Sequence, residues 1–226
     1  MDWTAIWVSL RLSFITMVVL LAIGLPIAYW IAFSAWRWKF LVEAVVALPL
    51  VLPPTVLGFY VLVAIGPASP VGQFWTTLTG TGLPFTFYGL LIASVLYSLP
   101  FAVQPFSAAF GAVDRRMLEA SWSLGSSKAD TFRRIVLPLS VRGLVTGMVL
   151  SFAHTLGEFG VVLMVGGNRP GITRTVSVSI YDDVQALDYA SAAQTSLLLL
   201  AASFVILAVT YAMQKSVWAV WPSHGR

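Results

Sequence analysis

The chain has 226 residues, of which 58% are hydrophobic and only 10% are charged, and its 13 Lys and Arg exceed its 9 Asp and Glu to give a net charge of +4. A soluble domain carries about 25% charged residues, so this composition excludes a disordered tail, a coiled coil and an ordinary water-soluble enzyme. The chain has no Cys, which excludes disulfides, thiolate zinc sites, cysteine-held iron–sulfur clusters and cysteine nucleophiles.

Long uncharged stretches indicate helices that cross a membrane. No charge interrupts residues 12–36, 44–113 or 189–214, and about 20 apolar residues of helix cross the hydrocarbon core. The middle stretch is long enough for two helices, separated by a Gly-, Pro- and Thr-rich connection at 66–86. The first apolar segment lacks the basic start of a signal peptide, so we expect it to remain in the mature protein. We predict an all-α polytopic membrane protein, a single domain over 1–226, with spans at about 9–33, 41–65, 87–110, 143–167 and 191–214.

The distribution of cations predicts the orientation of these spans. With the N-terminus outside, Arg11, Arg169 and Arg174 are the outer cations, and the other ten of the 13 Lys and Arg lie inside. Because Lys and Arg accumulate on the cytoplasmic side, we expect the N-terminus outside and the C-terminus in the cytoplasm of an inner-membrane protein. The net positive charge is then a topology signal, and no nucleic-acid partner is expected.

The inner loop 111–142 carries signals for two short helices outside the bilayer. Asp114 is a suitable N-cap for the first helix, and Gly125 stands where a residue of positive φ ends one. Ser127, followed by Asp130 three residues later, resembles a capping box for the second.

The amphipathic pattern of this helix pair fits two roles. The pair can dock another protein, or it can lie on lipid headgroups with its arginines paired to phosphates. Physical reasoning from the residues leaves both roles open. The arginines concerned are Arg115, Arg116, Arg133 and Arg134.

The same loop carries a longer pattern. Glu119-Ala120-Ser121, then three residues, Gly125, nine residues and Ile135-Val136-Leu137-Pro138 resembles the EAA loop of binding-protein-dependent ABC importer permeases. That family has E-A-A, three residues, G, nine residues and I-x-L-P in the loop before its penultimate helix. The spacing agrees throughout, and Ser121 in place of the second Ala is the one departure.

This resemblance implies a type I (MetI-like) importer permease fold and a set of partners. Two copies of the chain would form the pathway, two cytoplasmic ATPase subunits carrying ATP-Mg would bind the loop, and a periplasmic protein would deliver the substrate. Pairing of Glu119 with a nearby Arg would hold the two short helices in register. The residues expected to couple the chain to the ATPase are Arg115, Glu119, Ala120, Ser121, Gly125, Lys128, Ile135, Leu137 and Pro138.

Three further stretches resemble the molybdate permeases of this family. They are 48–58, 151–160 and 168–175. Sulfate and tungstate permeases are close relatives, and the short chain favours molybdate over sulfate. The binding protein mostly sets selectivity in such systems, so the choice of oxyanion stays open.

No feature of the chain itself indicates an enzyme. A G-x-x-x-x-G-K-[ST] loop and an H-E-x-x-H motif are both absent. We therefore expect no catalytic residue, no metal and no cofactor in this chain, and ATP hydrolysis in a separate subunit.

Prolines in the second predicted span indicate a broken helix. Pro49, Pro53 and Pro54 each lack a backbone donor, so this helix must kink or break. Broken backbone at membrane depth is tolerated where it is buried in protein or lines a cavity. With Thr55 and Gly58, this segment is expected to line the pathway, and a purely structural kink is the alternative.

Glu158 is the only acidic residue in the interior of a predicted span, since Glu43 lies at the very start of the second. A charge at the bilayer centre costs roughly 2.5–3.5 kcal/mol on insertion scales, and His154, one turn earlier, could pair with it. Gly157 and Gly160 would allow close helix approach. A carboxylate repels an oxyanion, so Glu158 is expected to act in a gate or in packing. The candidate hydroxyl donors to the anion are Ser151, Thr155 and Thr55, although Ser and Thr are also common where helices pack.

The outer loop 168–190 mixes Arg169 and Arg174 with three Asp residues. It either meets the binding protein or is simply solvated.

Two rival functions have weaker support. An ion-coupled secondary transporter usually has internal repeats and more helices. A membrane anchor for a redox enzyme would need paired intramembrane histidines for haem, and only His154 qualifies.

Overall fold

The structure is a computed structural model that describes residues 1–215, and these residues form helices and connections without strands. Four long helices are apolar enough to cross a membrane, and a bent pair of shorter helices can supply a fifth crossing. The C-terminal end, which we predict to face the cytoplasm, lies outside the described residues. The long helices are α1 (Trp3–Phe33), α5 (Phe87–Gly111), α8 (Leu137–Gly157) and α11 (Tyr189–Lys215).

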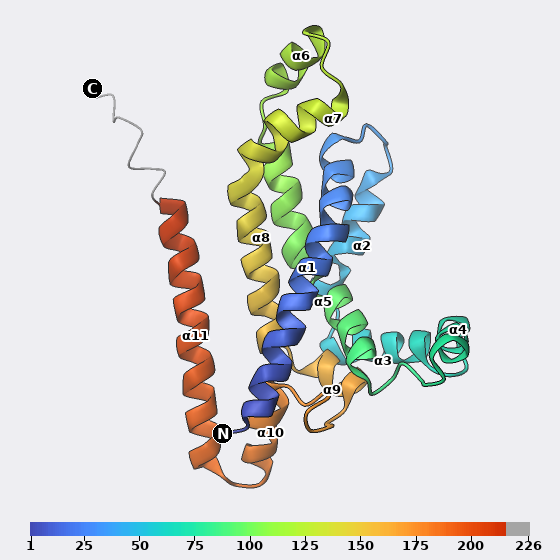
Figure 1. Cartoon of the computed structure of the whole chain (residues 1–226), viewed down its shortest axis with the longest axis vertical. Helices are drawn as coiled ribbons and strands as arrows, with labels where there is room; N and C mark the ends of the chain where they lie inside the picture. The colour runs from blue at the N-terminus through green and yellow to red at the C-terminus, as the bar shows by residue number, and fades with distance from the viewer. Residues whose placement is uncertain (216–226) are drawn as a thin grey trace.

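Helices α1, α5 and α8 pack together and form the centre of the molecule (Figure 1). Phe106 and Phe110 of α5 are fully buried there. A Cβ at Gly147 of α8 would lie 2.6 Å from the Phe106 ring, so only glycine permits this approach. Helix α11 stands apart in Figure 1, and only 11% of its most apolar stretch is buried.

The second predicted span, 41–65, is broken, as its prolines predicted. It is two helices, α2 (Lys39–Val51) and α3 (Pro54–Ile65), bent by 114°. The break falls at Pro53 and Pro54, which lack backbone donors, whereas Pro49 is accommodated inside α2. A turn at 66–69 connects α3 to α4 (Pro70–Thr79), which occupies part of the predicted connection, and the two helices extend sideways from the bundle (Figure 1).

The fourth predicted span, 143–167, also has different bounds. Helix α8 begins at Leu137 and ends at Gly157, the backbone of Glu158 is extended, and α9 (Gly160–Gly166) follows. The early start arises because the preceding segment enters α8 through η1 (Phe132–Val136), a π-helical turn, with Pro138 in the first turn of α8. Pro138 has no N–H to donate, and the π-helical turn directly before it lets the helix continue past the missing bond.

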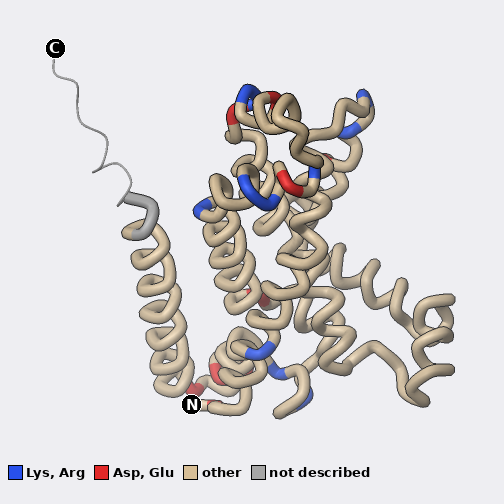
Figure 2. The backbone as a smooth tube through the Cα atoms, turned by 45° about the horizontal axis from the view of Figure 1, so that its top comes forward, with Lys and Arg blue, Asp and Glu red and all other residues tan. Residues whose placement is uncertain are grey.

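Short helices lie at the two ends of the bundle. Helices α6 (Arg115–Ser123) and α7 (Lys128–Thr131) project from one end, and α10 (Val176–Gln185) lies at the other (Figure 1). Figure 2 shows Lys and Arg gathered around α6 and α7, with few charges along the long helices. The cations of the loop that we predict to be cytoplasmic therefore lie together at one end of the bundle.

Candidate functional site

The first short helix of the inner loop is capped at both ends. Its N-cap Asp114 accepts a hydrogen bond from the backbone N–H of Arg116 at 2.9 Å. After α6, Gly125 has φ +82°, its N–H donates to the carbonyl of Trp122 at 2.9 Å, and the N–H of Ser126 donates to the carbonyl of Ser121 at 3.1 Å. These bonds close the turn that the glycine predicted.

The second short helix begins at its predicted cap. The N–H of Asp130 donates to Ser127 Oγ at 3.1 Å, and the Ser127 hydroxyl donates to the Asp130 carboxylate at 2.6 Å. Helix α7 then runs through η1 into α8. We call α6, the turn at Gly125 and α7 (residues 115–131) the inner helix pair. One end of this pair is thus joined to a long helix without a flexible linker.

A buried hydrogen bond joins the two helices of the pair. Ser121 Oγ lies 2.9 Å from Thr131 Oγ1, and both side chains are buried. Glu119 instead forms an ion pair with Arg115 Nε at 3.3 Å within α6, where both side chains are largely exposed. The prediction that Glu119 holds the two helices in register is therefore wrong, since its arginine partner stands four residues away on the same helix.

The sequence pattern does not predict the Ser121–Thr131 hydrogen bond. The one available signal was that Ser121 departs from the alanine of the family pattern. A hydroxyl at that position needs a partner once it is buried.

The inner helix pair presents apolar side chains at its outer surface. Leu124 is 87% exposed, and Met117 is also exposed. A patch of this kind, rimmed by charged residues, is typical of a surface that meets another protein. Among the predicted coupling residues, Ala120, Gly125, Lys128 and Pro138 are exposed, and Ile135 and Leu137 are half-buried.

The two broken helices meet. A Cβ added at Gly160 would lie 2.8 Å from Pro54 Cβ, and one added at Gly58 would lie 2.8 Å from Met164 Cβ. Helices α3 and α9 therefore pack at glycine-limited distance, directly beside both breaks. Of the other candidates here, Pro53, Thr55 and Gly157 are exposed, and Pro49 and Pro54 are half-buried.

Glu158 lies at the second break and is only 4% exposed. Within residues 1–215, neither oxygen of its carboxylate forms a hydrogen bond, and the Ser94 hydroxyl close to it also lacks one. His154 does not pair with Glu158, which corrects our expectation. Its Nδ1 lies 2.9 Å from Ser98 Oγ, and its ring stacks on Phe101 with the centroids 3.9 Å apart.

Two predicted anion donors already have protein partners. The Ser151 hydroxyl donates to the carbonyl of Met148, and Thr155 Oγ1 lies 2.9 Å from the carbonyl of Ser151 and 2.8 Å from Ser98 Oγ. Both side chains are buried. In this structure they contribute to helix packing, whereas Thr55 is exposed.

The charges of the outer loop form a network. Arg174 lies 3.0 Å from Asp182 and 3.6 Å from Asp2, so it joins the loop to the start of α1. Burial raises the pKa of Asp2, but hydrogen bonds from Thr4 and Ala5 and the charge of Arg174 outweigh this, so the pKa lies below its ordinary value. Arg169 Nη1 donates to the carbonyl of Phe85 at 2.8 Å. The alternative that these two arginines are simply solvated is therefore wrong, because both bind protein groups.

Comparison with known proteins now identifies the class. Residues 24–218 match the family described as binding-protein-dependent transport system inner membrane component, and the chain belongs to this family. It is a multi-pass membrane component of such a transport system.

Two relatives of known description are similar to most of the chain. The chain is 51% identical over 215 residues, 95% of each chain, to the molybdenum transport system permease protein ModB of Azotobacter vinelandii. It is 33% identical over 184 residues to ModB of Escherichia coli K12, with 81% of this chain and 80% of that protein covered.

Solved structures show the same fold at low identity. A bacterial ABC transporter that imports alginate matches with a TM-score of 0.76 at 17% identity, covering 95% of this chain and 79% of that one. The MetNI methionine ABC transporter, in an inward-facing form, matches with a TM-score of 0.72 at 16% identity over 94% of each chain. The fold is that of an ABC importer permease, as predicted.

Proposed function

We propose that this chain is the permease subunit of an ATP-driven importer that moves molybdate across the inner membrane. The observation that carries the proposal is the 51% identity, over 95% of both chains, to a molybdenum transport permease. Tungstate and sulfate remain the alternative oxyanions.

The proposed partners are those that membership of the transport family implies, and the inner helix pair offers a surface for one of them. Two copies of the chain form the pathway, and each inner helix pair binds one cytoplasmic ATPase subunit, which carries ATP-Mg. The exposed Leu124 and Met117 supply an apolar contact, and the capping bonds keep the two short helices rigid. A periplasmic oxyanion-binding protein delivers the substrate at the outer end.

Movement reaches the pathway through α8. Closure of the ATPase dimer around ATP draws the two inner helix pairs together. Because α7 continues through η1 into α8, displacement of the pair is transmitted along this helix to the break at Glu158. The break at Glu158 lies beside α3, which itself follows the break at Pro53. These two breaks together form a gate that can open outward.

Reconstituted transport tests the function. The chain, its ATPase and its binding protein are placed in liposomes, and uptake of radiolabelled molybdate is followed with and without ATP. We expect ATP-dependent uptake that requires all three proteins, with sulfate a poor competitor. Uptake by this chain alone, driven by an ion gradient, would identify a secondary transporter instead.

Glu158→Gln tests the gate. The substitution keeps the shape of the side chain and removes its acid, so any change in rate reflects the buried carboxyl. We expect uptake to fall roughly tenfold, equivalent to ~1.4 kcal/mol on the limiting step, while co-purification of the ATPase stays normal. Unchanged uptake by a normally assembled variant would sink the gating role.

A further inference from the structure

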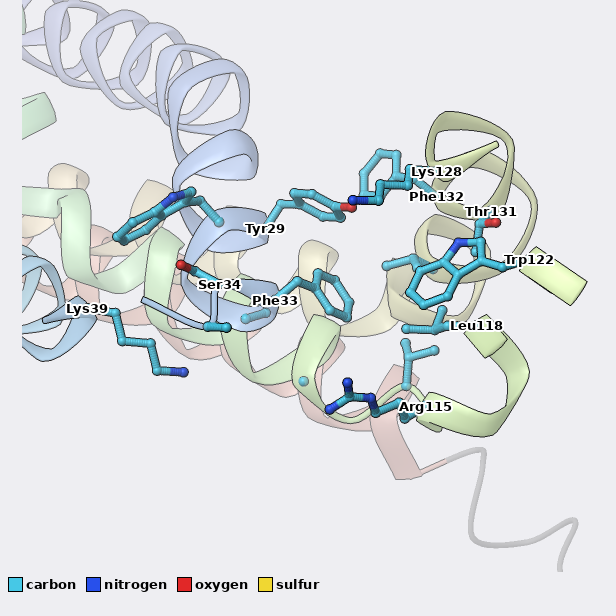
Figure 3. Close-up of a pocket in the computed structure, with 16 residues that line it drawn as sticks. Tyr29, Phe33, Ser34, Lys39, Arg115, Leu118, Trp122, Lys128, Thr131 and Phe132 are labelled. Carbon is cyan, nitrogen blue, oxygen red and sulfur yellow. The ribbon is translucent and has the colours of Figure 1, made fainter. Parts of the chain in front are cut away.

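A large cavity opens at the inner end of the molecule. It lies between the C-terminal end of α1, the connection to α2, the end of α5 and the inner helix pair (Figure 3), and its volume is ≈ 730 Å³. This volume falls in the range of sites that hold a small ligand.

Three cations line this cavity. They are Lys39, Arg115 and Lys128, and no Asp or Glu lines it within the part of the chain that the structure describes. In Figure 3, Lys39 and Arg115 lie on different sides of the pocket, and Lys128 points toward Tyr29.

Two of these cations have other contacts, which leave the excess of positive charge in place. Lys39 Nζ donates to the carbonyl of Ile31 at 3.4 Å. The ion pair of Arg115 with Glu119 is exposed and therefore weak.

The walls of the cavity are apolar and largely aromatic. Trp30 and Phe33 of α1 and Trp122 of α6 are 39%, 36% and 43% exposed, and Leu118 and Val136 form a buried part of the wall. Trp and Tyr are enriched at the boundary between membrane and water, and this is the end at which α1 and α5 leave the bundle. Cations beside exposed aromatic rings suit an amphiphile with an anionic head better than a small hydrated anion.

We propose that this cavity binds the phosphate headgroup of an anionic phospholipid from the cytoplasmic leaflet. Lys39, Arg115 and Lys128 contact the phosphate, and the upper acyl chain lies against Trp30 and Phe33. Leu118 and Thr131, on the inward side of the inner helix pair, face the same cavity. The lipid therefore braces the pair against α1 and sets its position for the ATPase. This inference rests on the inner orientation of the proposed function.

The test measures lipid retained by the purified full-length chain. A Lys39→Gln, Lys128→Gln double variant is compared with an Arg133→Gln, Arg134→Gln control, which removes the same charge from exposed positions outside the cavity. Native mass spectrometry counts phosphatidylglycerol and phosphatidylcholine bound to each. We expect the cavity variant to lose phosphatidylglycerol roughly tenfold relative to the control, with phosphatidylcholine unaffected. Equal retention by the two variants overturns the proposal.

Two further measurements address folding and the source of the phosphate. Ala35→Trp fills the cavity from the connection after α1 without removing a charge, and it is expected to lower lipid retention while the helical content of the chain stays unchanged. Millimolar inorganic phosphate or molybdate is expected to leave the lipid bound. Displacement of the lipid by either ion assigns the site to a free oxyanion and overturns the proposal. These outcomes do not depend on which anion is transported, so they can fail separately from the proposed function.

Discussion

Gly125 illustrates how one residue shapes the inner helix pair. A Cβ at this position would meet no atom within 4 Å, so space does not require glycine. The requirement comes from the backbone, because φ is +82° and a side chain is strained in the left-handed region.

Gly125→Ala is therefore expected to destabilise the turn by about 1–2 kcal/mol and to weaken co-purification of the ATPase. Gly111→Ala is the matched control, because it also meets open space but lies in α5 without a positive φ. Thermal melting and pull-down of the ATPase compare the two. Equal behaviour of the two variants would contradict the backbone argument.

Ser121 and Thr131 form a pair whose value can be measured. Ser121→Ala restores the alanine of the family pattern but leaves the buried Thr131 hydroxyl without its partner, at a cost of about 1–3 kcal/mol. Thr131→Val should have a similar cost, and the double variant should cost less than the sum of the two. Strictly additive losses in thermal melting would show that the hydrogen bond contributes nothing to stability.

At the scale of elements, two helices are broken at positions that face each other. Prolines break the first, and the second breaks at Glu158 between glycines. Glycines also limit the distance between the two broken segments, so the size of a side chain there controls how α3 sits on α9.

Gly58→Ala and Gly160→Ala are each expected to force the segments apart, with a loss of about 1–3 kcal/mol in stability and a marked fall in uptake. Gly157→Ala is the control, since a Cβ there meets nothing within 4 Å. Melting temperature and molybdate uptake are measured for all three variants. If the control impairs uptake as much as the others, close packing of α3 on α9 is not what the gate requires.

At the scale of the whole molecule, charges separate toward the two ends (Figure 2). The ordered outer network around Arg174 and the cationic inner helix pair are expected to lie on opposite sides of the membrane. The chain has no Cys, so a single introduced Cys is the only thiol that a reagent can modify.

We expect an impermeant maleimide to label Ala186→Cys, which is exposed after α10, in intact right-side-out vesicles. Ser123→Cys, which is exposed on α6, should be labelled only in inverted vesicles. The reverse pattern would refute the predicted orientation.

Local chemistry explains which features were predictable from the sequence. Long uncharged stretches predicted the long apolar helices, because the hydrocarbon core excludes charge. The caps at Asp114 and Ser127 and the turn at Gly125 were equally predictable, since their partners lie within a few residues.

Contacts between distant segments depended on the tertiary structure. The break after Gly157, the pairing of Ser98 with His154 and Thr155, and the Ser121–Thr131 bond arise where separate helices pack. The cationic cavity likewise draws its lining from α1, α5 and the inner helix pair. Sequence determines which residues prefer water, hydrocarbon or a cap, but packing alone decides which buried polar groups meet, because each can be satisfied by several partners of similar chemistry.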